Sequence, residues 1–164
     1  MISHAPAAVR TADRDDLQAV LDVHARQGGR PAGPPSRLER DTWDRMMAMA
    51  ELSVYVAEVD DAVVGTATAM TMPNVTYDCA PTVFVEAVVV LPEHRRRGIA
   101  RSMMQAILAD ARSGGCNKVQ LLSHKRHAHD GAHRLYTSMG FEPEAEGFRL
   151  YLGQRPRRAA PGLP

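Results

Sequence analysis

The stretch VFVEAVVVLPEHRRRGIARSMM (residues 83–104) predicts a strand, a tight basic turn and a helix in succession. Residues 83–91 are dense in β-branched side chains, as expected of a strand that is buried on both faces. Pro92 ends this strand because it has no N–H to donate to a neighbouring strand. After the turn, apolar residues recur at helical spacing on one face. They are Ile99, Met103, Met104, Ile107, Leu108 and Ala111.

The turn between this strand and this helix has the features of an anion-binding site. The first N–H groups of a helix have no partner within it, and they lie at the positive end of the helix dipole. Gly98 allows a ligand to approach the backbone closely, and the small side chain of Ala100 leaves room for it. The preceding arginines add positive charge. The turn therefore predicts binding of a phosphate or pyrophosphate.

Three segments in this order resemble one family. RRRGIA (residues 95–100) resembles the R/Q-x-x-G-x-G/A signature of the GNAT superfamily of acyl-coenzyme A-dependent N-acetyltransferases. VEAVVVLPEH (residues 85–94) resembles the central strand of that family, and LYTSMGF (residues 135–141) resembles its later helix. A short glycine signature alone is weak, but three segments in the right order and spacing are specific. The resemblance spans residues 52–152 and implies an α/β fold with a central mixed sheet and helices on both faces.

Length and composition are typical of one soluble globular domain. The chain has 164 residues, 45% of them hydrophobic and 24% charged. We expect a single GNAT domain over residues 1–153 and a disordered tail over residues 154–164, which are rich in Pro, Arg and Ala.

Charge, hydropathy and cysteine usage argue against several classes of partner. The net charge of +1, without a basic block, does not favour nucleic acid, and no apolar run reaches the roughly 20 residues that cross a bilayer. The N-terminus lacks a secretory pattern, and Cys79 and Cys116 lack metal-ligand spacing. We therefore expect a reduced, cytoplasmic setting.

The N-terminal third predicts a strand and two capped helices. The strand is expected near residues 8–11. Asp13 with Asp16, and Ser36 with Glu39, are typical of helix N-terminal caps. The second of these helices is expected to bury a stripe, which consists of Trp43, Met46, Met47 and Ala50.

The remainder predicts further strands around the central unit. Residues 52–59 and 63–72 alternate with period two about an Asp60-Asp61 turn, which predicts a hairpin. A strand over residues 118–123 should lie parallel to the central strand, because a helix connects them. Asp130 should cap a helix that ends at Gly140, and residues 141–145 and 147–152 predict a closing hairpin.

Two residues are candidates for acid–base catalysis. Glu86 is the only acidic residue in the apolar central strand, and burial there would raise its pKa towards that of a useful base. The resemblance implies that Glu86 deprotonates the amine and that Tyr136 protonates the thiolate of coenzyme A. A structural carboxylate and a tyrosine that fills a helix face are the alternatives.

The resemblance also implies an acetyl-CoA site. The backbone of Val88, Val89 and Val90 would pair with the pantetheine amides, and the Val88 N–H would polarise the thioester carbonyl. His129 stands where many relatives have an asparagine that contacts the coenzyme. The residues implied to hold the pyrophosphate are Arg95, Arg96, Arg97, Gly98, Ile99, Ala100, Arg101 and Ser102.

The histidines of the C-terminal third do not predict a metal site. His129 and His133 have i, i+4 spacing, but the residues between them lack the glutamate of the zincin pattern. We expect them at the rim of the coenzyme or acceptor groove. His124, at the end of its strand, is the alternative general base.

Together these patterns favour an acetyl-CoA-dependent N-acetyltransferase that works by direct attack in a ternary complex. The acceptor is a small-molecule or peptide amine, and its identity remains open. The alternative from another class is a catalytically inactive coenzyme A-binding sensor or interaction module. The resemblance also implies a tendency to form homodimers through the closing hairpin or an exposed sheet edge.

Overall fold

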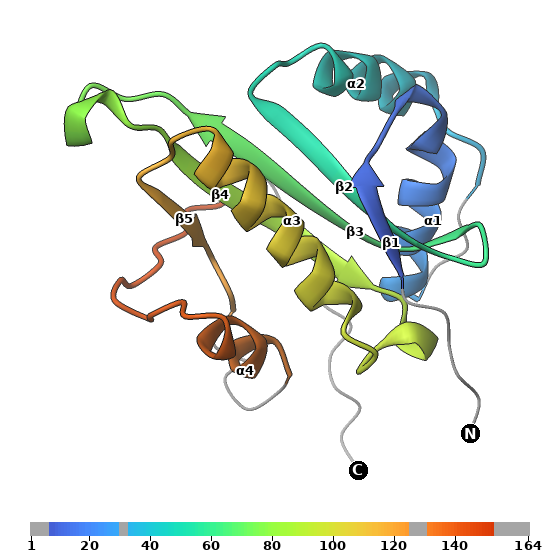
Figure 1. Ribbon diagram of the computed structural model, residues 1–164. Helices are drawn as coiled ribbons and strands as arrows, with labels where there is room; N and C mark the ends of the chain where they lie inside the picture. Colours follow the sequence, from blue (N-terminus) through green and yellow to red (C-terminus); the bar gives the residue numbers. More distant parts are fainter. Residues whose placement is uncertain (1–6, 30–32, 125–130, 153–164) are drawn as a thin grey trace. The chain divides into compact units, whose positions relative to one another are not determined.

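The computed structural model describes residues 7–29, 33–124 and 131–152, and its contacts group the chain into two compact units that divide after Leu122. The first unit is built on a five-stranded sheet in the order β1-β2-β3-β4-β5 (Figure 1). Strands β1 to β4 are antiparallel in succession, whereas β5 is parallel to β4. The predicted hairpin and the predicted parallel strand are both confirmed. The strands are β1 Ala8–Thr11, β2 Leu52–Val59, β3 Ala62–Met72, β4 Thr82–Val90 and β5 Lys118–Leu121.

Helices cover both faces of this sheet, which confirms the predicted mixed α/β architecture. Helices α1 (Leu17–Gln27) and α2 (Arg37–Met47) cover one face, where Trp43 packs with Val20, Val54 and Val56. On the other face lies α3 (Ile99–Ser113), whose Asp110 accepts a hydrogen bond of 2.6 Å from the Tyr55 hydroxyl. Burial, followed by this hydrogen bond, raises the pKa of Tyr55. Consecutive residues of β2 thus point to opposite helical layers, as strand pleating requires.

The two predicted capping boxes are present at the N-terminal helices. Asp13 accepts from the Asp15 N–H at 2.9 Å, while the Asp16 carboxylate accepts from the Asp13 N–H at 2.8 Å. Ser36 and Glu39 form the reciprocal pair that starts α2. The predicted buried stripe of α2 was wrong at Ala50: the helix ends at Met47, and Ala50 lies exposed in the following turn.

The second unit contains helix α4 (Gly131–Ser138), followed by irregular chain. The predicted closing hairpin was wrong, since residues 141–152 form no strand in the described chain. Pro143 lacks an N–H for a ladder, and an isolated two-stranded hairpin is barely stable in water. The predicted cap Asp130 lies outside the described residues. No helix in the described part of the chain combines the length and apolar character needed to cross a bilayer.

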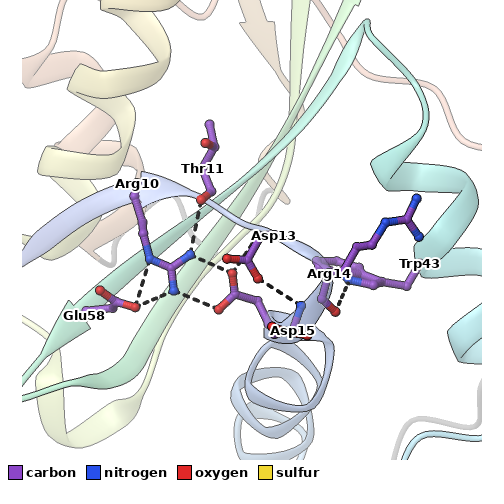
Figure 2. Close-up of polar contacts among 8 residues, drawn as sticks. Arg10, Thr11, Asp13, Arg14, Asp15, Trp43 and Glu58 are labelled. Carbon is purple, nitrogen blue, oxygen red and sulfur yellow. Dashed lines mark hydrogen bonds and ion pairs between the residues drawn. The ribbon is translucent and has the colours of Figure 1, made fainter.

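An ion-pair network fastens the edge strand β1 to α1 and β2 (Figure 2). The Arg10 guanidinium donates to both carboxylate oxygens of Asp16, at 2.7 and 2.9 Å, and to Glu58 Oε1 at 3.0 and 2.5 Å. The hydrogen bonds from Arg10 hold the pKa of Asp16 below its usual range. Asp16 is only 7% exposed, and its carboxylate accepts from both the Arg10 guanidinium and the Asp13 N–H.

Asp16→Asn is expected to lower the free energy of unfolding at pH 7 by about 1.5–3 kcal/mol, the typical value of hydrogen bonds to charged groups. Because the folded pKa of Asp16 lies below the ordinary value of 3.8, its contribution is complete above that value. It is lost as the pH falls through the lower folded pKa. Urea unfolding at pH 7, 5 and 3 should therefore show a difference from wild type that is constant to pH 5 and shrinks at pH 3. An undiminished difference at pH 3 would contradict the ionic origin.

Candidate active site

The turn that precedes α3 lies between two buried apolar residues, Leu91 and Ile99. The Leu91 N–H donates to the Val64 carbonyl at 2.9 Å, which extends the ladder of β4 by one residue. The chain then makes a short 3₁₀ turn, Pro92–His94, and α3 begins at Ile99. Ile99 is buried, and the next turn of the helix places Met103 and Met104 at 0% exposure against the sheet. The predicted strand–turn–helix unit is confirmed, with Leu108 only half-buried on its helical face.

The backbone of this turn leaves open space in front of the first N–H groups of α3. Gly98 has φ +80°, and, apart from Gly98 and the two residues that flank it, no atom lies within 4 Å of the position a Cβ would occupy there. The hydrogen bond from the Ser102 N–H to the Gly98 carbonyl, at 3.0 Å, closes the first turn of α3. The N–H groups of Ile99 and Ala100 precede it and have no carbonyl one helical turn behind them. The N–H groups of Ile99 and Ala100 lie at the positive end of the helix dipole, and the space beside Gly98 is open. This is the arrangement that favours anions at helix N-termini.

The arginines of the turn differ in what they contact. Arg95 Nε donates to the Val90 carbonyl at 3.1 Å, and Arg97 Nη1 donates to His94 Nδ1 at 3.0 Å. Arg96 is exposed and has φ +63°. Arg101 and Ser102 are half-buried, and the Ser102 hydroxyl lies 3.4 Å from the Gly98 carbonyl. Arg95 and Arg97 thus brace the turn in this structure, whereas Arg96 extends its charge into solvent.

Strand β4 is irregular in the segment that precedes the turn. Thr68 pairs with Glu86 and Thr66 with Val89, so β4 carries one more residue than β3 over this interval. Ala87, within the interval, has φ +53°. This is a β-bulge, which bends a strand and redirects its side chains.

The bulge in β4 follows the last residue of β4 that pairs with β5. In the described chain, β5 pairs only with residues 82–85 of β4. Within the described residues, positions 86–90 therefore present one backbone edge without a strand partner, and the turn that contains Gly98 follows in the chain. Such an edge can pair with an extended ligand that carries amide groups, as an added strand does. The Val90 carbonyl is already engaged by Arg95.

Glu86 is exposed, so its predicted burial was wrong. In the sheet register Glu86 lies opposite Thr68, which in turn lies opposite Val54. Val54 packs with Trp43 of α2, so Glu86 shares the face of the sheet that α1 and α2 occupy. These helices do not cover it. The carboxylate is open to solvent on the face opposite α3.

Tyr136 belongs to the second unit, where the end of α4 determines its position. The N–H groups of Gly140 and Phe141 donate to the carbonyls of Thr137 and Tyr136, both at 3.0 Å, and Gly140 has φ +89°. These bonds form a Schellman motif, and its usual apolar contact is present. The rings of Tyr136 and Phe141 meet edge to face with centroids 5.9 Å apart. The predicted role of Gly140 as the residue that ends the helix is confirmed.

The histidines predicted at the rim are only partly described. His124 is exposed, and His133 is half-buried on α4, while His129 lies outside the described residues. Among the described residues, no three His, Cys, Asp or Glu side chains are grouped closely enough to hold a metal ion.

Gly65 positions the bulged strand against its neighbours, and sequence reasoning missed it. A Cβ at Gly65 would lie 3.0 Å from the Val89 carbonyl oxygen and 3.2 Å from the Met103 methyl group. Only glycine lets β3 come this close to both the bulged strand and α3. The signal was an isolated glycine within an alternating strand, which often marks a close backbone approach.

Comparisons with known proteins agree with this geometry. The profile of the acetyltransferase (GNAT) family matches residues 17–141. The aminoglycoside N(6')-acetyltransferase type 1 of Salmonella typhimurium is 24% identical over 112 residues, which cover 67% of this chain and 76% of that protein.

Solved structures share the fold over nearly their whole length. A structure from Agrobacterium tumefaciens assigned as an acetyltransferase has a TM-score of 0.79 at 30% identity and covers 88% of this chain and 99% of its own. The aminoglycoside acetyltransferase AAC(6')-Iy, solved with a bisubstrate analogue of coenzyme A, has a TM-score of 0.72 at 20% identity. That alignment covers 92% of this chain and 100% of the other. The family profile, the mixed sheet and the strand–turn–helix unit together show that this chain belongs to the GNAT acetyltransferase family.

Proposed function

We propose that this protein transfers the acetyl group of acetyl-CoA to an amine by direct attack within a ternary complex. The observation that carries the proposal is the backbone edge of β4 from the bulge at Ala87 to Val90, which has no strand partner among the described residues and is followed in the chain by the open turn at Gly98. An extended pantetheine chain fits such an edge, and a pyrophosphate fits the N-terminal end of α3. A coenzyme A thioester is a single ligand that contains both an extended pantetheine chain and a pyrophosphate.

In this proposal the coenzyme lies along Val88 and Val89, and the Val88 N–H polarises the thioester carbonyl as negative charge develops on its oxygen. The turn supplies N–H donors from Gly98, Ile99 and Ala100. Exposed Arg96 adds long-range attraction for the pyrophosphate. For Val90 to join the pairing, Arg95 must release its carbonyl.

Glu86 is the proposed general base. Its exposed carboxylate, on the face of the sheet opposite α3, is accessible to an amine or to a water that relays the proton. The amine nitrogen attacks the thioester carbon, the C–S bond breaks, and Tyr136 is proposed to protonate the leaving thiolate. The proposed acceptor is a small-molecule amine, and the resemblance to aminoglycoside acetyltransferases supports that class.

The test is thiol release from acetyl-CoA with a panel of aminoglycosides, polyamines and amino acids. With the best acceptor, Glu86→Gln is expected to lower kcat by about 10²–10⁴-fold, the usual contribution of a general base. Coenzyme affinity should be unchanged, because the carboxylate makes no proposed contact with the coenzyme. Tyr136→Phe should also lower kcat without weakening coenzyme binding.

Asp15→Asn is the matched control, since it removes an exposed carboxylate from a different part of the first unit. A Glu86→Gln enzyme with a kcat within twofold of wild type would reject Glu86 as the base. If wild type binds acetyl-CoA and acetylates no amine of the panel, the coenzyme-binding module becomes the better description.

A further inference from the structure

A row of apolar side chains crosses the sheet beside Glu86. Leu52 of β2 pairs with Met70 of β3, and Met70 pairs with Phe84 of β4. Leu52 packs against the core cluster that contains Trp43, so the row lies on the face of the sheet that α1 and α2 occupy. Glu86 follows Phe84 by two residues on β4, and residues two apart in a strand point to the same face. The Glu86 carboxylate therefore lies at the edge of this row.

The helical layer covers the β2 end of this row and leaves the remainder open to solvent. Met70 is 38% exposed, and Met72, two residues further along β3, is 44% exposed. Phe84 is half-buried. A sheet face that meets water usually carries polar side chains, and adjoining apolar groups with a polar rim are typical of binding surfaces. We refer to Met70, Met72 and Phe84 as the apolar platform.

The carboxylate beside the apolar platform is free of cationic partners within the described residues. The ion pairs of that part of the chain do not include Glu86. Lys118, on the same face, pairs with Thr82, which precedes Glu86 by four residues, or roughly 13 Å along the strand. The Lys118 ammonium instead lies 5.3 Å from the centroid of the Tyr77 ring. Glu86 is thus available to a cation that a ligand supplies.

A ligand with a cationic head and an apolar body meets both features. From this arrangement we propose that the amine acceptor is a primary alkylamine, with its ammonium at Glu86 and its hydrocarbon chain on the apolar platform. Phe84 and Glu86 lie roughly 7 Å apart along the strand, about the length of hexylamine. A polyhydroxylated amine gains less from this surface, because its hydroxyls lose water there without finding hydrogen-bond partners. This acceptor site rests on the proposed function, in which Glu86 deprotonates the amine.

The first test measures thiol release from acetyl-CoA with ethylamine, butylamine and hexylamine, which carry the same charge at neutral pH. The value of kcat/KM should rise about fourfold for each methylene that becomes fully buried and about twofold for one that is half-buried. Met70→Gln, which keeps the length of the side chain and makes it polar, should reduce this rise. Met70→Leu keeps the platform apolar and should preserve it. An equal kcat/KM for the three amines, or an undiminished rise in Met70→Gln, would overturn the proposal.

Saturation-transfer NMR of hexylamine with the full chain tests the site without turnover. Saturation should reach the terminal methyl group of the amine in wild type and in Met70→Leu, and less of it in Met70→Gln. Absence of transfer in wild type would overturn the proposal. Transfer without acetylation of any amine would instead reject the proposed transferase and leave the platform as an amine-binding surface.

The same variants distinguish a small amine from a second copy of the chain. If two copies associate through the apolar platform, Met70→Gln should lower the dimer fraction in analytical ultracentrifugation and leave hexylamine binding unchanged. That pair of results would assign the platform to a protein interface and overturn the proposal. Weaker hexylamine binding in Met70→Gln, with no change in the sedimentation of the protein, is the expected outcome.

Discussion

Gly98→Glu is expected to weaken acetyl-CoA binding more than 100-fold in a calorimetric titration, while the protein stays folded. The new side chain would enter the open space in front of the first N–H groups of α3, where we place the pyrophosphate. A carboxylate about 4 Å from a phosphate charge is repelled by about 4 kcal/mol at the effective dielectric constant of a protein surface. A loss of about 2.7 kcal/mol already corresponds to 100-fold.

Gly115→Glu is the matched control for this experiment. Gly115, just past the other end of α3, has φ +64°, and no atom other than those of Gly115 and its two chain neighbours lies within 4 Å of its Cβ position. Both substitutions therefore place a side chain at a positive φ and add the same charge, at opposite ends of one helix. Equal loss of binding in both variants would point to general damage. Retention of binding by Gly98→Glu would remove the turn from the coenzyme site and, with it, the main support for the proposed function.

Trp43→Ala is expected to lower the free energy of unfolding by about 3–5 kcal/mol, the usual cost of removing a buried aromatic side chain. Trp43 is 4% exposed and packs with Val20 of α1 and with Val54 and Val56 of β2. Its indole Nε1 also donates to the Arg14 carbonyl at 3.1 Å (Figure 2). One side chain thus joins α2, α1 and the sheet. Urea denaturation followed by circular dichroism measures the difference.

Trp43→Phe separates packing from hydrogen bonding. Phenylalanine keeps an aromatic ring in the core but leaves the Arg14 carbonyl without its donor, at a cost of about 1–3 kcal/mol. Its loss of stability should therefore be smaller than that of Trp43→Ala. Equal losses in the two variants would show that the hydrogen bond, and not the buried area, dominates the contribution of Trp43.

Local patterns in the sequence were the most accurate predictors of structure. The capping pairs Asp13–Asp16 and Ser36–Glu39 form as predicted, because each is complete within four residues. The strand–turn–helix unit around Gly98 follows from Pro92, the glycine and the apolar spacing of α3. At the end of α4, Gly140 and Phe141 donate to carbonyls that lie only three and five residues before them, respectively.

Predictions that depended on distant parts of the chain were less accurate. Glu86 was expected to be buried because its neighbours in the strand are apolar, yet α1 and α2 do not extend over it. The closing hairpin was expected from the alternation of residues 147–152, but alternation does not supply a partner strand. The catalytic roles of Glu86 and Tyr136, and the contacts of the coenzyme-site residues, stay predictions.

By itself the sequence determined the family, the mixed sheet and the strand–turn–helix unit around Gly98, because these depend on short-range spacing, on backbone preferences at Pro and Gly, and on a local signature. Only the tertiary structure decided which side chains lie exposed, where β4 parts from β5, and that Gly65 admits a close approach of Val89. It also placed Met70 beside Phe84 on one face of the sheet. Exposure and strand pairing depend on residues far apart in the chain, and no local pattern specifies which distant elements will meet.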